Sequence, residues 1–148
     1  MSSTPGACGD DEGHGTFDHT GDLGLVVWAP TPERLFARAV LAVLAQVAET
    51  RGHESEVTAG VSCEAPDPGD LLVDLCNAAL LEAEVRHAIW TDARVTLEGG
   101  SRLRAELSGP RRDPRRQTFL REIKAVSHHA LDLDLTPGRC RCRLVLDV

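Results

Sequence analysis

The sequence predicts a single α+β domain in which two helices pack on a mainly antiparallel or mixed β-sheet. The 148 residues, 42% of them hydrophobic, match the size of one domain with a substantial core. Two segments carry apolar residues at helical spacing, and several others alternate apolar and polar residues as strands do. Because strands and helices do not alternate regularly along the chain, an α+β arrangement is favoured.

The amino-terminal segment, residues 1–15, is rich in glycine and acidic side chains and has almost nothing to bury. This composition predicts a disordered tail, with order beginning near Thr16 and one domain over residues 16–148. The segment lacks the basic start and apolar stretch of a secretion signal, and no run reaches about 18 consecutive apolar residues. We therefore expect a cytoplasmic protein that does not contact a membrane.

A first helix is predicted from Thr31 to about Thr50, after a β-rich strand over residues 23–29. Thr31 supplies the N-cap oxygen, Pro32 suits the first turn, and Glu33 complements the helix dipole. The helix has one apolar stripe, which needs a sheet or a helix to cover it. The stripe consists of Phe36, Val40, Val43, Leu44 and Val47.

A second helix is predicted from Asp70, as its N-cap, to about Arg86. It follows a half-buried strand over residues 57–63 and a turn at residues 66–69. Its inner face consists of Leu71, Leu72, Leu75, Ala79 and Leu80.

The remaining segments predict strands. Residues 93–97 and 102–107 flank Gly99-Gly100, which indicates a hairpin. The last two strands are expected at about residues 122–133 and 139–148, on either side of a turn.

Charge and cysteine content narrow the classes of function. The formal net charge is -7, which argues against a protein that mainly grips nucleic acid by neutralising phosphates. Any role in RNA metabolism is then expected to run through a protein partner. The five cysteines show no CxxC spacing, so we interpret them as reduced and mostly buried rather than as disulfides or zinc ligands.

A basic loop between Gly109 and Gln117 concentrates positive charge on an otherwise acidic chain. It is either a solvated loop or a contact for RNA phosphates or for an acidic patch of a partner. Its basic side chains are Arg111, Arg112, Arg115 and Arg116.

A polar cluster over residues 18–22 adjoins the first strand and includes His19 and Asp22. Taken alone, it is compatible with nucleophilic catalysis, a metal site or a turn. Catalysis is the weakest interpretation, because the sequence has no GxSxG elbow, no second acid–base partner and no phosphate-binding glycine loop. A small metal-dependent hydrolase that uses Asp22 and His19 stays an alternative, as does a plain protein-binding module.

The carboxyl end places Asp147 next to the terminal carboxylate of Val148. Two fixed negative groups at this spacing repel each other, and adding Asp22 would increase the repulsion unless a cation lay between them. Such an all-oxygen cluster suits Ca²⁺ or Mg²⁺ rather than zinc. A frayed terminus is the simpler alternative from these residues alone.

Two separated segments resemble the archease family, small proteins that activate RNA ligases of the RtcB type. Residues 17–24, FDHTGDLG, are similar to the family's DHTAD-(V/I)-G start, and residues 122–129, EIKAVSHH, to its E-(V/I)-K-A-(I/V)-T-Y-H segment. Further similarity over residues 31–39, 71–77 and 146–148 extends the resemblance to about residues 16–148.

The resemblance implies a function and a set of site residues. Asp22, Asp147 and Val148 would bind a divalent metal, with Ca²⁺ expected and Mg²⁺ or Mn²⁺ as alternatives. Lys124, the only lysine, and His19 would act at the partner's nucleotide site. The protein would not be an enzyme. It would promote guanylylation and multiple turnover of the ligase in tRNA splicing and RNA repair, and would meet RNA only through the ligase.

The sequence departs from the family pattern at several positions. Gly21 replaces the usual alanine and Ser127 the threonine, which are mild changes. His128 replaces the tyrosine and Ala130 an often acidic residue, so partner contact or metal affinity is expected to differ there.

Overall fold

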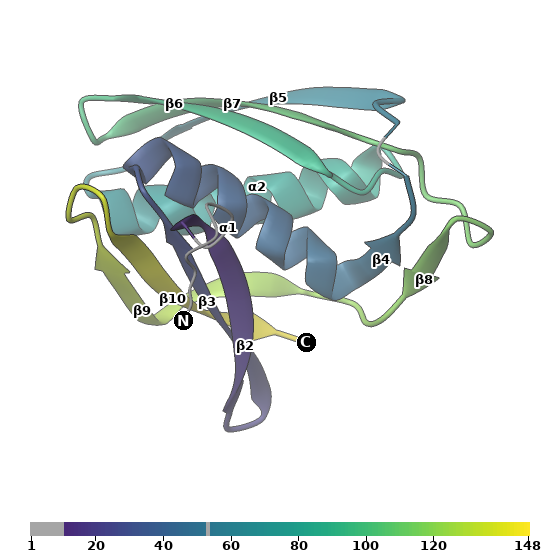
Figure 1. The fold of residues 1–148 in the computed structure, drawn as a ribbon, viewed down its shortest axis with the longest axis horizontal. Helices are drawn as coiled ribbons and strands as arrows, with labels where there is room; N and C mark the ends of the chain where they lie inside the picture. The colour runs from purple at the N-terminus through teal and green to yellow at the C-terminus, as the bar shows by residue number, and fades with distance from the viewer. Residues whose placement is uncertain (1–10, 53) are drawn as a thin grey trace.

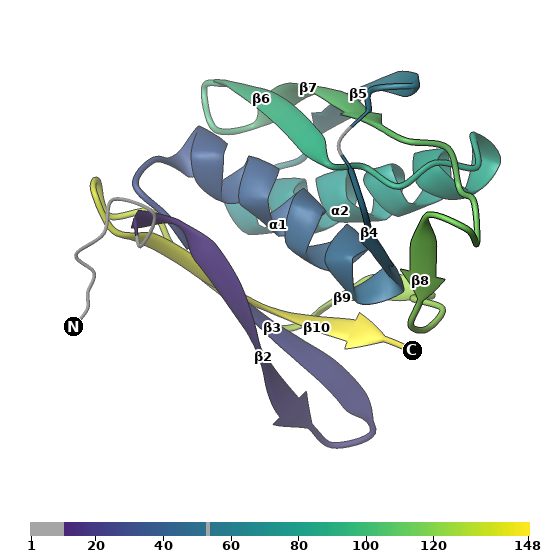
Figure 2. The ribbon, with the colours of Figure 1, turned by 45° about the vertical axis from the view of Figure 1, so that its right-hand side comes forward.

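The computed structural model describes residues 11–52 and 54–148, and it places both helices between two antiparallel sheets (Figure 1). The expected α+β class is confirmed, with a second sheet covering the outer side of the helices (Figure 2). The predicted disorder of residues 1–10 lies outside the described residues. In the described part of the chain, no helix is long and apolar enough to cross a membrane.

The larger sheet has four strands in the order β2-β3-β10-β9, all antiparallel. Its strands are β2 (Gly13–His19), β3 (Asp22–Ala29), β9 (Ala125–Asp134) and β10 (Cys140–Asp147). Alternate side chains of the two inner strands, such as Leu25 and Leu144, are fully buried. The strand that comes last in the sequence, β10, therefore lies inside the sheet, between β3 and β9.

The second sheet has three strands in the order β5-β7-β6, and its two pairings are antiparallel. Its strands are β5 (Val57–Glu64), β6 (Asp92–Glu98) and β7 (Arg102–Gly109). The predicted hairpin is confirmed, because Gly99 and Gly100, with φ values of 66° and 80°, join β6 to β7. Positive φ at both positions is the geometry that favours this pair of glycines.

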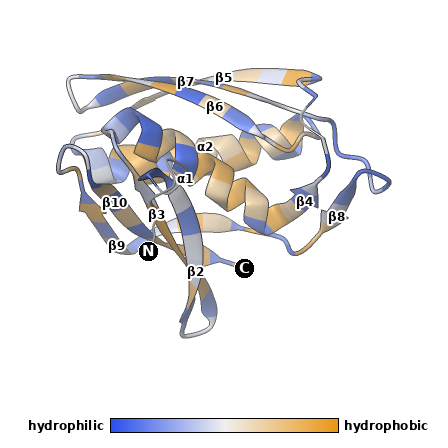
Figure 3. Ribbon diagram, in the orientation of Figure 1, coloured by the Kyte–Doolittle hydropathy of each residue, from blue (hydrophilic) through white to orange (hydrophobic). Residues whose placement is uncertain are grey.

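Helix α1 (Pro32–Val47) begins as predicted, with Thr31 as N-cap accepting a hydrogen bond from the Arg34 backbone N–H at 3.2 Å. All five residues of its predicted stripe are buried, and so are Leu35, Ala37, Ala39 and Ala42. A helix covered by sheets on two sides buries more than one stripe, which is why its small residues are buried as well (Figure 3).

Helix α2 (Pro68–Val85) begins earlier than predicted, so the assignment of Asp70 as N-cap is wrong. The N-cap is Asp67, whose side chain accepts a hydrogen bond from the Asp70 backbone N–H at 2.9 Å. Pro68 follows it in the first turn, as Pro32 follows Thr31 in α1. The two helices thus share one start signal, an oxygen-bearing cap followed by proline.

Two short strands correct the predicted end of α1. The helix was expected to reach about Thr50 but ends at Val47, because β4 (Ala48–Thr50) leaves it in an extended conformation and pairs with β8 (Gln117–Phe119). The following strand, β9, begins at Ala125 rather than near residue 122. Residues 121–124 form the connection from β8, tied to the end of α1 by the Arg121 side chain, which donates to the Gln46 carbonyl at 2.8 Å.

The predicted tail also needs correction. Strand β2 begins at Gly13, so residues 13–15 are ordered against β3, with Gly13 opposite Trp28. A Cβ on Gly13 would lie 2.9 Å from the Trp28 ring, so glycine permits the indole to lie there. Glu12, just before the strand, forms an ion pair with Arg34 of α1. Pairing and packing thus order a segment whose composition alone predicts disorder.

The cysteines behave as small hydrophobic residues. Cys76, Cys140 and Cys142 are buried and Cys63 is half-buried, and all four are free. Burial raises the pKa of the Cys142 thiol to about 12. The expectation of reduced, mostly buried cysteines is confirmed for these four, while Cys8 lies outside the described residues.

Candidate functional site

Four strand ends meet at one end of the larger sheet, and they carry most of the site residues expected from the sequence. Strand β2 ends at His19 and β3 begins at Asp22, joined by a two-residue turn. Strand β10 ends at Asp147, and β9 begins directly after Lys124. The β2–β3 hairpin extends beyond the rest of the molecule on this side (Figure 1).

The turn of this hairpin explains one departure from the family pattern. Gly21 has a φ of 73°, a left-handed conformation that glycine adopts without steric cost. The turn sets His19 directly opposite Asp22 in the register of β2 and β3. The His19 Nδ1 atom lies 3.7 Å from the Asp22 Oδ2 atom, which is longer than a hydrogen bond.

The register of β3 and β10 brings the two aspartates together. The register ends at the pair of Leu23 and Leu146, and Asp22 and Asp147 adjoin this pair on the two strands. Opposite residues of an antiparallel pair have their side chains on one face of the sheet. Leu146 is fully buried toward the helices, so alternation directs the two carboxylates to the outer face.

Lys124 is joined to the same end of the sheet from the other side of β10. Its backbone N–H donates to the Asp147 carbonyl at 2.8 Å, and the next residue, Ala125, pairs with Asp147 in the sheet register. Within residues 11–52 and 54–148, the Lys124 ammonium has no hydrogen bond or ion pair. The Lys124 backbone thus adjoins Asp147, and its side chain is exposed.

We call this group of residues the strand-end cluster, and it consists of His19, Asp22, Lys124, Asp147 and Val148. Among the described residues, no arginine neutralises the negative charge of its aspartates. Neither Asp22 nor Asp147 lies within ion-pair distance of an arginine or lysine among the described residues. Other carboxylates, such as Glu12 and Glu56, do pair with arginine. Adjacent and unneutralised carboxylates are the arrangement that a bound cation relieves.

The donor set fits a hard divalent cation only if the carboxyl terminus takes part. No group of three His, Cys, Asp or Glu side chains in the described part of the chain is placed to hold a metal. The expected set has two such side chains, Asp22 and Asp147, and takes its third ligand from Val148. Val148 is 46% exposed, so the end of the chain is accessible for this role.

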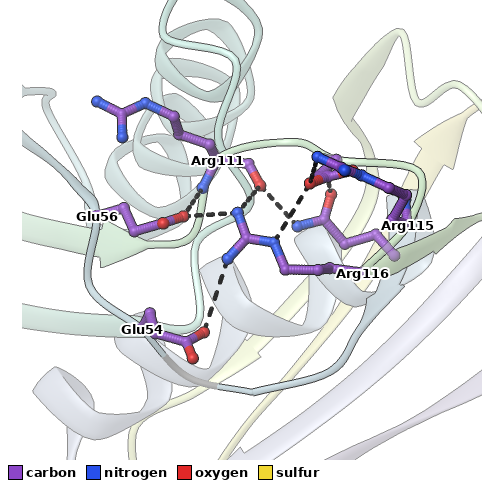
Figure 4. Close-up of polar contacts among 7 residues, drawn as sticks. Glu54, Glu56, Arg111, Arg115 and Arg116 are labelled. Carbon is purple, nitrogen blue, oxygen red and sulfur yellow. Dashed lines mark hydrogen bonds and ion pairs between the residues drawn. The ribbon is translucent and has the colours of Figure 1, made fainter.

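The basic loop makes more ion pairs with the rest of the protein than its sequence indicates. Arg116 lies between three carboxylates, with its guanidinium nitrogens 2.7 Å from Glu56, 3.7 Å from Asp113 and 3.8 Å from Glu54 (Figure 4). The Arg116 guanidinium holds the pKa of Glu56 below its usual value. These contacts tie the loop to the connection between β4 and β5.

The other three arginines of the loop differ in how far they are engaged within the protein. Arg112 pairs with Glu84 of α2 at 3.0 Å and donates to the Ala88 carbonyl, so it too is engaged within the protein. Arg115 pairs with Asp113 but has a side chain that is 89% exposed. The Arg111 side chain is exposed and points away from the carboxylates around Arg116 (Figure 4). The purely solvated loop is therefore not what is observed, and Arg111 and Arg115 are the two side chains left open to a partner.

His128 and Ala130, the two other positions that depart from the family pattern, lie in β9. His128 has its Nε2 atom 3.7 Å from the Asp70 carboxylate and 3.7 Å from the Asp74 carboxylate, both on α2. Burial and the nearby Asp67 raise the pKa of Asp70. The side chain of Ala130 lies outside what the structure describes. His128 thus contacts α2 rather than the strand-end cluster.

Sequence reasoning missed Asn77, whose side-chain amide binds the backbone at Val126, near Lys124. Its position on a helix resembles that of many solvent-facing amides, so no local pattern signals the role. It also missed a groove of about 840 Å³ between α2 and residues 119–124, which Lys124 lines.

Comparison with known proteins identifies the family of the chain. A profile of the archease protein family matches residues 14–148. The archease of Methanosarcina mazei is 30% identical over 136 residues, which span 89% of this chain and 93% of that protein. The archease of Methanopyrus kandleri is 29% identical, over 89% of this chain and 96% of that protein.

Two solved structures share the fold. The solution structure of protein 1598 of Methanobacterium thermoautotrophicum matches with a TM-score of 0.79 and 23% identity, over 92% of this chain and 99% of that one. An archease of Thermotoga maritima, described as a possible chaperone, matches with a TM-score of 0.62 and 19% identity, over 89% and 94% of the two chains. With the family profile spanning nearly all described residues, this chain belongs to the archease protein family.

Proposed function

We propose that this archease is a metal-binding activator of an RtcB-type RNA ligase, which it would help to become guanylylated and to turn over repeatedly in tRNA splicing and RNA repair. The observation that carries the proposal is the meeting of Asp22, Asp147 and Lys124 at adjacent strand ends. These residues come from distant parts of the sequence. Their adjacency supports a shared role that none of the three would have alone.

In this proposal Asp22, Asp147 and the Val148 carboxylate hold the metal. Oxygen ligands suit Ca²⁺ best, with Mg²⁺ or Mn²⁺ as alternatives. A bound divalent ion would supply positive charge for phosphate oxygens at the partner's nucleotide site. Lys124 would add a second positive charge, since its ammonium is not engaged within the described part of the protein.

His19 has a supporting place in the same proposal. Its ring faces Asp22 across the hairpin, with Nδ1 buried and without a hydrogen bond in the described structure. It is thus available to fix the Asp22 carboxylate or to meet the ligase. RNA would be reached through the ligase, because the formal charge of -7 disfavours direct binding along the phosphate backbone.

The test is a single-turnover assay of ligase guanylylation with and without this protein, in the presence of GTP and a divalent metal. We expect faster formation of the ligase–GMP intermediate with the wild type and no acceleration with Asp22→Ala. The absence of acceleration by the wild type would overturn the proposal. Phosphoesterase activity of the protein alone, lost in Asp22→Ala and in His19→Ala, would instead support a hydrolase.

A further inference from the structure

A groove lined in part by apolar side chains lies beside Lys124. It has a volume of about 840 Å³ and lies between the second half of α2 and the segment that joins β8 to β9. Leu80 and Leu81 line it from the helix, and Phe119, Leu120 and Lys124 from the segment. Lys124 therefore belongs both to the groove and to the strand-end cluster.

Exposed apolar side chains of the described residues gather around this groove. Leu81, Phe119 and Leu120 are 62%, 45% and 40% exposed, and all three line it. The two other large hydrophobic residues exposed in the described chain are Val85, one helical turn beyond Leu81, and Val148, which follows Asp147. Exposed apolar residues scattered singly need no explanation, whereas a contiguous patch with a polar rim marks an interaction surface.

The polar rim of the groove has three cations, Arg112, Arg121 and Lys124, and two carboxylates, Glu84 and Glu122. Arg112 is engaged with Glu84, and Arg121 with the Gln46 carbonyl. The Lys124 ammonium has no partner among the described residues, so it is the cation of the rim that is left to attract an acidic group. An apolar segment with a carboxylate at one end would satisfy both the floor and this rim.

We propose that the groove receives an apolar segment of the partner ligase that carries an acidic side chain toward Lys124. This inference rests on the proposed function. Docking in the groove would place the ligase against Lys124. The nucleotide site of the ligase would thereby be held near the end of the sheet that carries Asp22 and Asp147. The groove would supply affinity, while the strand-end cluster would act on the bound ligase, so the two contributions are separable by measurement.

The experiment compares Leu81→Glu with the wild type and with Thr96→Glu, which adds the same charge to an exposed position of β6 in the other sheet. Direct binding of the ligase is measured at equilibrium, and guanylylation rate is measured against activator concentration. For Leu81→Glu we expect the dissociation constant and the half-saturating concentration to rise by about tenfold or more. The guanylylation rate at saturation should stay at the wild-type value, and Thr96→Glu should match the wild type throughout.

A milder pair, Leu81→Ala with Phe119→Ala, covers the case in which the added charge disturbs folding, which circular dichroism and thermal unfolding would reveal. It should also weaken ligase binding.

Unchanged binding by correctly folded groove variants would overturn the inference while leaving the proposed function intact, provided that the wild type accelerates guanylylation. Failure of the wild type to bind the ligase overturns both. A wild-type dimer that Leu81→Glu converts to monomer, with ligase binding unchanged, would assign the groove to self-association and overturn the inference.

Discussion

The side-chain amide of Asn77 makes two hydrogen bonds with the backbone of Val126: its Nδ2 donates to the carbonyl at 3.0 Å, and its Oδ1 accepts from the N–H at 2.8 Å. Val126 lies in β9, an edge strand of the larger sheet. The amide therefore takes the place of a neighbouring strand at this residue. It fixes the start of β9 against α2, two residues after Lys124.

Replacing Asn77 by alanine is expected to lower the free energy of unfolding by about 1 to 3 kcal/mol, because two partly buried backbone groups lose their partners. Urea unfolding measures this loss. Glu82→Ala is the control, since Glu82 on the same helix has only an exposed ion pair with Arg86, and its removal should cost less than about 1 kcal/mol. Equal effects of the two substitutions would show that the Asn77 bonds add nothing specific.

The same substitution should reduce activation of the ligase more than it reduces binding. Asn77→Ala leaves the exposed apolar residues of the groove in place but frees the strand that positions Lys124. At a temperature where the variant is fully folded, we expect a lower guanylylation rate at saturating activator. A normal rate would mean that the position of Lys124 does not depend on Asn77.

Asp22→Ala and Asp147→Ala are expected to abolish most calcium binding without unfolding the protein. Carboxylates on the outer face contribute little to the core, so the free energy of unfolding without metal should change by about 0.5 kcal/mol or less. Calorimetric titration with Ca²⁺ measures the affinity. Asp18→Ala, which removes the same charge from an exposed position of the same hairpin, should keep the wild-type affinity. A collapsed fold in either site variant would identify that aspartate as structural.

The end of the chain gives a separate test of the proposed metal ligands. Because the Val148 carboxylate is one of them, a peptide tag added after Val148 should weaken Ca²⁺ binding more than the same tag added before Met1. Titration of both tagged proteins under identical conditions compares them. Equal affinities would remove Val148 from the ligand set.

The Arg116 cluster predicts a dependence of stability on pH. Arg116 lowers the pKa of Glu56 from its usual 4.5, and Arg115 and Arg116 lower that of Asp113 from 3.8. A carboxyl with a lowered folded-state pKa stabilises the fold above its unfolded pKa, and this contribution is lost as the pH falls from there through the folded value. The midpoint of thermal unfolding should therefore differ most between wild type and Arg116→Ala near pH 7, and the difference should shrink below pH 4.5.

Arg111→Ala is the matched control for this measurement, since it removes a cation from the same loop while the Arg111 backbone contact to Glu56 remains. Its unfolding midpoint should stay close to the wild type across the pH range, because the Arg111 charge is the smallest of the effects on the pKa of Glu56. A constant difference between wild type and Arg116→Ala from pH 7 to pH 3 would show that the ion pairs do not set the pH dependence.

The parts of the fold that the sequence predicts correctly depend on local chemistry. Thr31 and Pro32 mark the start of α1, and Gly99-Gly100 marks a hairpin, because capping and positive φ need particular residues within a few positions. Strands β4 and β8 have three residues each and stabilise one another across a long separation. A strand of three residues is too short to show an alternation of apolar and polar residues, so the sequence predicts that the helix continues over β4. At α2 the same start signal, a capping oxygen followed by proline, is present in Asp67-Pro68, but these residues are also typical of a turn.

The site was less accessible to sequence reasoning than the fold. Asp22 and Asp147 each look like an ordinary polar residue at a strand end, and only the pairing of β3 with β10 brings them to the same end of the sheet. That pairing cannot be deduced from hydrophobic alternation, which is compatible with several strand orders. The family resemblance implies a shared role for the two aspartates, but it gives no indication of Asn77 or of the groove.

The central place of β10 has a consequence for how the protein is made. Strands β3 and β9 are not neighbours, because β10 lies between them and pairs with both. The larger sheet therefore closes only when β10 is in place, and only then do Asp22 and Asp147 come to the same end of the sheet. Premature termination near residue 139 would leave two unpaired strand edges, prone to aggregation, rather than a smaller activator.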